Sequence, residues 1–403
     1  MRKVCSITSP LACFVARGMS SPPIEGSHVA SRKIIEAATR AGINSQVLTI
    51  ESDAGAIKNH KNWIAVSSKI KSQFLPSAFL TADDWLASVN ILSRLNFSNN
   101  NLIHILNVTK EAYVIAHSLL RVKKPLLVHF FHSQHVLADD VFLMRNIALR
   151  AGLFGRVLDN HILTTTLSMS RFLVNTLGID QGRVHYAPYP IDTDKFKPLR
   201  DIHGLREKHR LPSDHPIVAY VGSLQPARGL SVLVKAFQHV INRLPRALLL
   251  VSHPQRCEEV IYEKSLGELV RNLKIGNNVI IRGASSNIEE IYNLSDVLVL
   301  PLVRPYWVDP PLVLLEAMSS GSAVIATPVG AIGDVLSDQK NALLTRFGDP
   351  LDLAEAIIQL LQNPRKSRKL GENARETVVQ NYSYEVVGKN LSKIYQLVLD
   401  CQN

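Results

Sequence analysis

The sequence predicts an α/β protein made of two doubly wound domains, each with a parallel sheet. Short apolar runs typical of buried strands alternate with longer segments of helical period along the 403 residues. This alternation occurs twice, and the segment 186–192, which contains two prolines, separates the two series. In sheets of this kind, ligands bind beyond the carboxyl ends of the strands.

The predicted elements follow from these patterns. In the first half, strands are expected at 4–8 (ending at Pro10), 46–50, 102–106, 126–131 and 162–165, with helices at 29–40, 110–120, 136–149 and 168–177. In the second half, strands are expected at 217–221, 247–251, 279–281, 297–300 and 323–326, with helices at 230–243, 257–273, 287–294 and 312–319. Three helices should close the chain, at 353–361, 365–381 and 383–399. We place the domains at 1–195 and 196–380, with a final helical segment at 381–403.

The composition excludes several classes of protein. Hydrophobic residues make up 46% and charged residues 20%, as in globular proteins, which excludes disordered, collagen-like and coiled-coil chains. No apolar run is long enough to span a bilayer, and the four scattered cysteines suit neither a disulfide framework nor a zinc pair. Polar residues interrupt the apolar stretch after Met1, so we do not expect secretion. We expect a cytoplasmic location.

The net charge of +11 is distributed unevenly. Residues 1–200 hold 23 Lys and Arg against 13 Asp and Glu, whereas residues 201–403 hold 22 against 21. A basic domain attracts anionic membrane or anionic small molecules, and it can also be a solvated surface without a partner. Nucleic acid is not expected, because no interleaving of aromatic and basic residues accompanies the charge.

The segment 299–330 carries the strongest indication of a binding site. A strand ends at Pro301, a loop follows, and a helix is expected from Pro310 and Pro311. The free N–H groups and the positive dipole end of that helix would form an anion site facing the loop. Glu316 lies in this helix among apolar neighbours, so its carboxylate requires a hydroxyl or cationic partner.

The stretch PPLVLLEAMSSGSAVIATPVG (310–330) resembles the donor-nucleotide signature of the retaining GT-B glycosyltransferases of family 4. Other segments resemble the same family in order and spacing: VGSLQPARGLSVLVKAF (221–237), VHYAPYPIDTDKFKP (184–198), PPIEGSHVASRKIIEAATRAG (22–42), PLLVHFFHS (125–133) and NYSYEVVGKNLSKIYQLVL (381–399). The resemblance implies a GT-B fold, in which two Rossmann-like domains face each other across a cleft and the last helix crosses back to the first domain.

The resemblance also implies roles for individual residues. Glu316 matches the glutamate that binds the ribose hydroxyls of the donor, and Arg228 matches a cation that clamps its diphosphate. Gly26 matches the glycine that lets the first helix approach the phosphates, and His132 matches the histidine near the reactive edge of the sugar. Five further residues are expected to complete the donor nucleotide site, namely Gly222, Ser223, Gly283, Pro311 and Leu312.

The sequence departs from the family pattern at three places. Ser223 stands where the family has a second cation, so that charge is missing or is supplied by another residue such as Arg304. Glu25 replaces the first of two adjacent glycines. Val308 stands where the family has a first glutamate that contacts the donor sugar, and the adjacent Asp309 is the expected substitute.

Two apparent metal motifs do not fit a metal site. The DTD segment at Asp192–Asp194 lies in the linker and not at the end of a strand inside a nucleotide domain. In the second, His129 and His132 would face opposite sides of a strand, with His135 further on and no carboxylate or cysteine cluster beside them. We therefore expect neither a metal nor another cofactor.

We expect a retaining hexosyl- or related glycosyltransferase (EC 2.4) that moves a sugar from a UDP-, GDP- or ADP-sugar to an acceptor hydroxyl. The acceptor is a glycan, a lipid-linked molecule or a small molecule, and an anionic membrane surface is a further partner of the basic half. His132, Arg228 and Asp309 are the expected catalytic residues. Two alternatives stay open: a GT-B sugar-nucleotide epimerase or non-catalytic relative, and a two-domain solute-binding protein.

Overall fold

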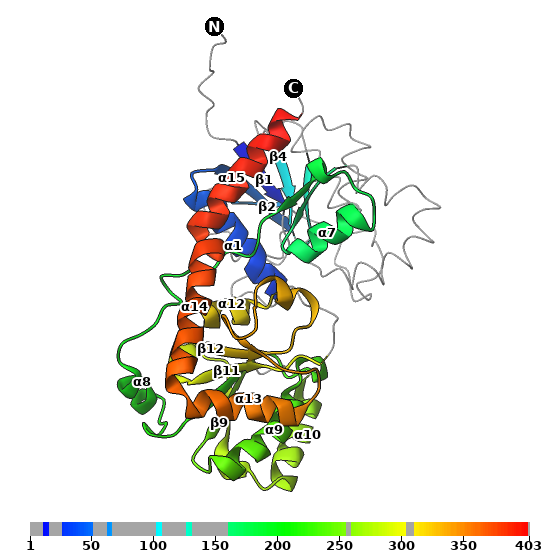
Figure 1. The fold of residues 1–403 in the computed structure, drawn as a ribbon. Coiled ribbons are helices and arrows are strands. Elements are labelled where there is room, and N and C mark those ends of the chain that lie inside the picture. The colour runs from blue at the N-terminus through cyan, green and yellow to red at the C-terminus, as the bar shows by residue number, and fades with distance from the viewer. Residues whose placement is uncertain are drawn as a thin grey trace. The chain divides into compact units, whose positions relative to one another are not determined.

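The computed structural model describes residues 11–15, 26–50, 63–66, 102–106, 126–130, 160–254, 259–303 and 310–401 (Figure 1). The chain forms two compact units: unit 1 consists of Met1–Pro190 and Tyr384–Asn403, and unit 2 consists of Ile191–Ser383. The predicted strand 4–8 and the predicted helices 110–120 and 136–149 lie outside the described residues. Within the described part, no helix is both long and apolar enough to span a membrane.

In its described part, unit 1 contains a parallel sheet of seven strands in the order β3-β2-β1-β4-β5-β6-β7. The strands are β1 (Leu11–Val15), β2 (Asn44–Ile50), β3 (Trp63–Val66), β4 (Leu102–Ile105), β5 (Leu126–Phe130), β6 (His161–Thr164) and β7 (Val184–Tyr186). The order reverses between β1 and β4, as in a Rossmann domain. The fold class predicted from the sequence is confirmed for this unit.

The first described strand was not predicted from the sequence. β1 begins directly after Pro10, at which the predicted strand 4–8 was expected to end. Its residues Ala12 and Phe14 are fully buried between β2 and β4, so the apolar run after the proline enters the sheet. Proline is tolerated just before a strand because no ladder N–H is needed there. The short strands β3 and β7 were not predicted, because three or four residues show too little periodicity.

Three described helices belong to unit 1: α1 (Gly26–Arg40), α7 (Leu167–Asn175) and α15 (Tyr384–Asp400). α15, the final helix of the chain, packs along α1 (Figure 1). A Cβ at Gly388 would overlap with the Ala37 carbonyl, so the two helix backbones meet there at a distance that only glycine permits. Tyr384 donates a hydrogen bond of 3.0 Å to Glu36 and ties the start of α15 to α1.

A buried polar chain joins α15 to the sheet of unit 1. The Tyr395 hydroxyl lies 2.7 Å from Nδ1 of His104 on β4, and Nε2 of His104 lies 3.1 Å from Nδ1 of His129 on β5. Burial lowers the pKa of His104 to about 3, so its ring is neutral at pH 7. A second pair joins β6 to β7, where His161 Nδ1 lies 3.0 Å from His185 Nε2. Burial and then the charge of His161 lower the pKa of His185 to about 4.

Unit 2 also has a Rossmann-like parallel sheet, with six described strands in the order β10-β9-β8-β11-β12-β13. They are β8 (Ile217–Val221), β9 (Leu248–His253), β10 (Val279–Gly283), β11 (Val297–Leu300), β12 (Ala323–Ala326) and β13 (Leu343–Leu344). The described α-helices are α8 (Ile202–Lys208), α9 (Leu230–Arg243), α10 (Val260–Asn272), α11 (Ile288–Leu294), α12 (Leu312–Ser319), α13 (Pro350–Gln362) and α14 (Pro364–Tyr382).

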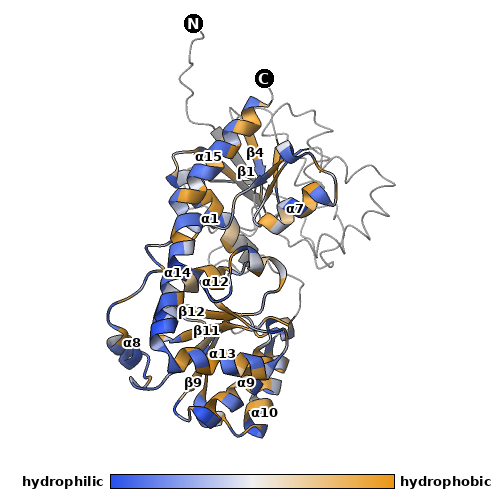
Figure 2. Ribbon diagram, viewed as in Figure 1, coloured by the Kyte–Doolittle hydropathy of each residue, from blue (hydrophilic) through white to orange (hydrophobic). Residues whose placement is uncertain are grey.

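The core of unit 2 forms where α9 and α13 pack on the sheet. Phe237 on α9, Ile357 on α13 and Tyr220 on β8 are among its buried members. Figure 2 shows β11 and β12 in the hydrophobic colour, whereas α14 is largely hydrophilic. The predicted strands and helices of this half are confirmed to within a few residues, and α9 and α12 have the predicted bounds.

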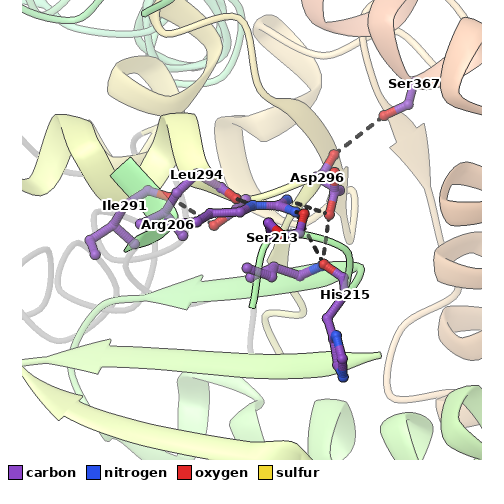
Figure 3. Close-up of polar contacts among 9 residues, drawn as sticks. Arg206, Ser213, His215, Ile291, Leu294, Asp296 and Ser367 are labelled. Atoms are coloured by element: carbon purple, nitrogen blue, oxygen red, sulfur yellow. Dashed lines mark hydrogen bonds and ion pairs between the residues drawn. The ribbon is translucent and has the colours of Figure 1, made fainter. Parts of the chain in front are cut away.

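A buried arginine closes the end of unit 2 at which β8 and β11 begin. No helix was predicted between the segment 186–192 and the strand at 217–221, but α8 forms there and buries Arg206. Figure 3 shows the contacts of its guanidinium. It donates to Asp296 at 3.0 Å and to the carbonyls of Leu294, Ser213 and His215 at 2.8–3.2 Å. These bonds fix α8 against the amino ends of the strands.

The first and last residues of unit 2 lie together. Ile191 donates its N–H to the Tyr382 carbonyl at 2.7 Å, and Ile191 forms a parallel bridge with Ser383. The linker that follows Ile191 is also fixed within unit 2. Its Phe196 carbonyl accepts hydrogen bonds from Ser319 at 2.6 Å and from Arg375 at 3.1 Å.

The buried histidines predict that unit 1 loses stability in mild acid. Their folded pKa values lie below the unfolded value of about 6.5, so the unfolded chain binds more protons between these limits. The stability is therefore complete above about pH 6.5 and falls as the pH decreases, by about 2 kcal/mol at pH 5 for the fully buried His104 and by less for the half-buried His185. Hydrogen exchange of the β4 and β5 amides between pH 5 and 7.5, corrected for intrinsic rates, measures this fall.

The variant His104→Leu combined with Tyr395→Phe should show a shallower pH dependence, since it removes one of the two groups without leaving the hydroxyl unpaired. His239→Gln is the control, because His239 is exposed on α9 of unit 2. A pH dependence unchanged by the double substitution would contradict the assignment to His104.

Candidate functional site

The candidate site lies at the carboxyl ends of β8 and β11 in unit 2. These strands are neighbours, and the strand order of the sheet reverses between them. Loops that leave such a switch point diverge and leave room for a ligand. The loop after β8 comprises residues 222–229, and the chain after β11 runs from Pro301 to the start of α12. The two segments are joined where Val303 donates its N–H to the Ala227 carbonyl at 2.9 Å.

Two glycines shape the loop 222–229, and both have positive φ angles. Gly222 leaves β8 with φ 147°, and Gly229 precedes α9 with φ 72°. A Cβ at Gly229 would overlap with the Pro301 carbonyl, so the loop approaches the end of β11 at backbone distance. Arg228 is therefore held directly beside this contact, at the end of the 3-10 turn Pro226–Arg228, and is half-buried.

Glu316 lies in the middle of α12 with one face of the helix in the core. Its neighbours Leu314, Leu315, Ala317 and Met318 are fully buried, whereas Glu316 is half-buried. The Tyr292 hydroxyl on α11 donates to Glu316 Oε2 at 3.2 Å, which supplies the hydroxyl partner expected from the sequence. Burial and the nearby Glu316 charge raise the pKa of Tyr292 well above its usual range, so this hydroxyl stays protonated.

The bounds of α12 agree with the prediction, but the expected place of Pro310 and Pro311 does not. The helix begins at Leu312, and Pro311 is its N-cap, so the proline pair precedes the helix instead of occupying its first turn. Pro311 provides no side-chain hydrogen bond to the helix, but its carbonyl accepts from Leu314 and Leu315. Pro311 and Leu312 are half-buried.

The structure brings most of the predicted donor-site residues of unit 2 to one edge of the sheet. Gly222, Ser223, Arg228, Pro311, Leu312 and Glu316 follow the adjacent strands β8 and β11. Gly283 ends β10, two strands from β8, and Gly26 begins α1 in unit 1. His132, Arg304, Val308 and Asp309 lie outside the described residues.

Sequence reasoning missed three side chains that hold this edge. Tyr292 contacts Glu316, while Tyr220 and Glu259 contact the loop 222–229. Tyr220 and Tyr292 read as ordinary core residues of a strand and a helix. Glu259 lies in a charged segment that reads as solvent-exposed, but its side chain is buried. No local pattern marks any of the three, since each acts on a residue from another element or the following loop.

Residues 201–377 match the sequence model of the family Glycosyl transferases group 1. The match covers less than half of the chain and lies within unit 2. It contains the loop 222–229 and α12, which carry the motifs expected from the sequence. The similarity to this family thus lies in the same part of the chain as the candidate site.

Two curated relatives illustrate the likeness. The chain is 29% identical over 201 residues to N-acetyl-alpha-D-glucosaminyl L-malate synthase of Bacillus anthracis, a match that covers 50% of each chain. It is 28% identical over 274 residues to D-inositol 3-phosphate glycosyltransferase 2 of Catenulispora acidiphila, covering 62% of this chain and 61% of that protein. The chain thus spans about half to three-fifths of the length of these relatives.

Solved structures share the fold over almost the whole chain. Anabaena HepE in complex with UDP has a TM-score of 0.77 at 17% identity, covering 96% of this chain and 99% of that one. Sucrose-phosphate synthase from Thermosynechococcus elongatus has a TM-score of 0.77 at 21% identity, covering 97% and 100%. These likenesses confirm the GT-B class of two Rossmann-like domains predicted from the sequence.

The close approach at Gly229 predicts an unusually damaging alanine substitution. Gly229→Ala adds both the strain of a positive φ angle, about 1–2 kcal/mol, and an overlap with the Pro301 carbonyl that forces the loop away from β11. We expect a loss in the free energy of unfolding well above 2 kcal/mol, measured by urea denaturation of unit 2.

Gly348→Ala is the matched control. Gly348 also has a positive φ, 65°, but an added Cβ would meet nothing within 4 Å. This variant should lose only the free energy of unfolding that corresponds to the strain of the positive φ angle, about 1–2 kcal/mol. Equal losses for the two variants would show that the contact with Pro301 contributes nothing.

Proposed function

We propose that this protein transfers a sugar from a nucleotide-diphosphate sugar to an acceptor hydroxyl, with retention of configuration. The similarity of residues 201–377 to a glycosyltransferase family supports the class of reaction, and the site supports the class of donor. The observation that carries the proposal is the placement of Arg228 in the loop after β8 and of Glu316 in α12, the helix that follows the adjacent strand β11. A cation and a hydroxyl-binding carboxylate at one switch point suit a diphosphate and a ribose.

In this proposal, Glu316 accepts hydrogen bonds from the ribose hydroxyls. Tyr292 donates to the same carboxylate and holds its orientation. Arg228 and the amino end of α12 neutralise the negative charge that develops on the leaving diphosphate. Because Ser223 brings no charge, Arg228 is the cation that the loop 222–229 itself supplies. The chemistry assigned to these residues requires no metal.

Further parts of the proposal extend beyond the described site. His132 and Asp309 are proposed to contact the donor sugar near its reactive carbon, and Gly26 is proposed to adjoin the phosphates. The acceptor is proposed to be a glycan, a lipid-linked molecule or a small molecule in the synthesis of cell-surface polysaccharide or a related glycoconjugate. The excess of basic residues in 1–200 supports a cytoplasmic protein at the inner face of an anionic membrane.

Glu316→Ala should weaken the binding of a nucleoside diphosphate by about 10- to 150-fold, since charge-assisted hydrogen bonds contribute about 1.5–3 kcal/mol. Calorimetry with UDP, GDP and ADP on the full chain measures the affinity. Glu355→Ala is the control, because Glu355 forms an exposed ion pair with Arg243. An unchanged affinity in the Glu316 variant with its fold intact would remove the ribose assignment.

A sugar epimerase or a non-catalytic relative is the second candidate, favoured by Val308 and Ser223 in place of the family's charged residues. A panel of UDP-, GDP- and ADP-sugars with candidate acceptors separates the two. We expect acceptor-dependent release of a nucleoside diphosphate, with the anomeric configuration of the product retained. An epimerised sugar nucleotide without glycoside would support the epimerase. Binding without any turnover would support the non-catalytic relative.

A further inference from the structure

One peptide group of the loop 222–229 is held at both of its polar atoms by buried side chains. The Ser223 carbonyl accepts a hydrogen bond of 2.7 Å from the Tyr220 hydroxyl. The N–H of Leu224, which belongs to the same peptide group, donates to Glu259 Oε2 at 2.9 Å. Because a peptide group is planar, two bonds on opposite sides fix its rotation. We call Tyr220 and Glu259 the peptide clamp.

Both side chains of the peptide clamp come from the interior of unit 2. Tyr220 lies near the end of β8 and is 1% exposed, and Glu259 immediately precedes α10 and is 3% exposed. Burial raises the pKa of Tyr220 and prevails over the opposing charge of Arg228, so the hydroxyl keeps its proton and donates at neutral pH.

A buried carboxylate at this position requires a reason. Glu259 Oε2 lies 3.9 Å from His253 Nδ1, and Oε1 has no hydrogen-bond partner in the part of the chain that the structure describes. Removing a carboxylate from water costs several kcal/mol unless its hydrogen bonds compensate. The one short bond that Glu259 makes here is the bond to the loop. The bond therefore fixes the loop at the expense of burying a charge.

The clamp acts in the middle of a loop that is already tied at both ends. Gly222 donates its N–H to the Ser252 carbonyl on β9 at 3.1 Å. At the other end, the Ala227 carbonyl accepts from Val303 after β11. Between these ties, the clamp sets the direction in which the chain runs toward Arg228. The three attachments leave the loop little freedom before a ligand arrives.

We propose that Tyr220 and Glu259 are positioning residues that hold the loop 222–229 in the conformation that binds the diphosphate of the donor. This inference rests on the proposed function. A loop fixed in advance loses little conformational entropy on binding, and its cation needs no reorganisation as charge develops on the leaving group. Neither residue touches the ligand in this scheme, because each acts through the peptide between Ser223 and Leu224.

The charge of Glu259 provides a way to test the mechanism. A carboxylate beneath a diphosphate site repels the ligand, so a favourable role must come from its hydrogen bond and not from its charge. Glu259→Gln keeps an acceptor oxygen and removes the charge, whereas Glu259→Leu removes both. If the clamp acts by geometry, the glutamine variant should bind as tightly as the wild type or more tightly, and only the leucine variant should bind weakly.

The experiment compares these variants and Tyr220→Phe in the full chain, using the member of UDP, GDP and ADP that the wild type binds most tightly. We expect Tyr220→Phe and Glu259→Leu to weaken the binding of the nucleoside diphosphate by about 5- to 20-fold. The corresponding nucleoside, which lacks phosphates and is measured by displacement, should change by less than about twofold. Tyr384→Phe is the matched control, since it removes another tyrosine–glutamate hydrogen bond, in unit 1.

A merely structural role would give a different pattern. If the role is structural, the substitutions weaken the binding of nucleoside and diphosphate equally, and Tyr220→Phe has the same effect when Arg228 is replaced by alanine. Under the proposal, the effect of Tyr220→Phe on diphosphate binding should instead fall below about twofold in the Arg228→Ala background. Either result would overturn the proposal, as would an unchanged diphosphate affinity in both Tyr220→Phe and Glu259→Leu. If Glu259→Leu does not fold, Tyr220→Phe and Glu259→Gln decide alone. A wild type that binds none of the three diphosphates would overturn the proposed function and the clamp together.

Discussion

The pairing of β8 with β11 is the constraint on which the candidate site depends. It brings together two segments of the chain separated by more than seventy residues, and it sets the loop 222–229 beside the chain that leads to α12. The contact at Gly229 and Pro301 is possible only because one partner has no side chain. Arg228 and Glu316 owe their common location to this pairing, as neither is near the other in sequence.

Much of the architecture could be predicted because it is encoded locally. The apolar stripe of α9 and the continuous apolar runs of β8 and β11 each mark an element without reference to the rest of the chain. The strand β1 was missed because a proline can precede a strand as readily as it ends one, and Pro10 was read only as an end. α8 was missed because its seven residues carry mostly polar side chains, and the burial of Arg206 depends on carbonyls and a carboxylate brought by distant segments.

The candidate site also combines residues that local sequence motifs indicate with residues that only the fold brings into place. The family motifs lie within single loop–helix segments, so Arg228 and Glu316 could be proposed from the sequence. The residues that orient them could not, because their roles arise from folding. Tyr292 and Glu316 are 24 positions apart, and Leu224 and Glu259 are 35 apart. The buried histidines of unit 1 are a further case: nothing near His104 in the sequence indicates that its partner is Tyr395 in the last helix.

The bridge between Ile191 and Ser383 bears on how unit 2 could be exchanged within a gene that encodes this fold. Unit 2 is a continuous insertion in unit 1, and its two ends are hydrogen-bonded neighbours. Unit 1 is the host domain and unit 2 is the inserted guest domain, and the two are joined by chain at two adjacent points only. The guest could therefore be exchanged for another of the same fold by joining the chain at 191 and 383, without rerouting either backbone. The two units could in this way diversify as separate modules.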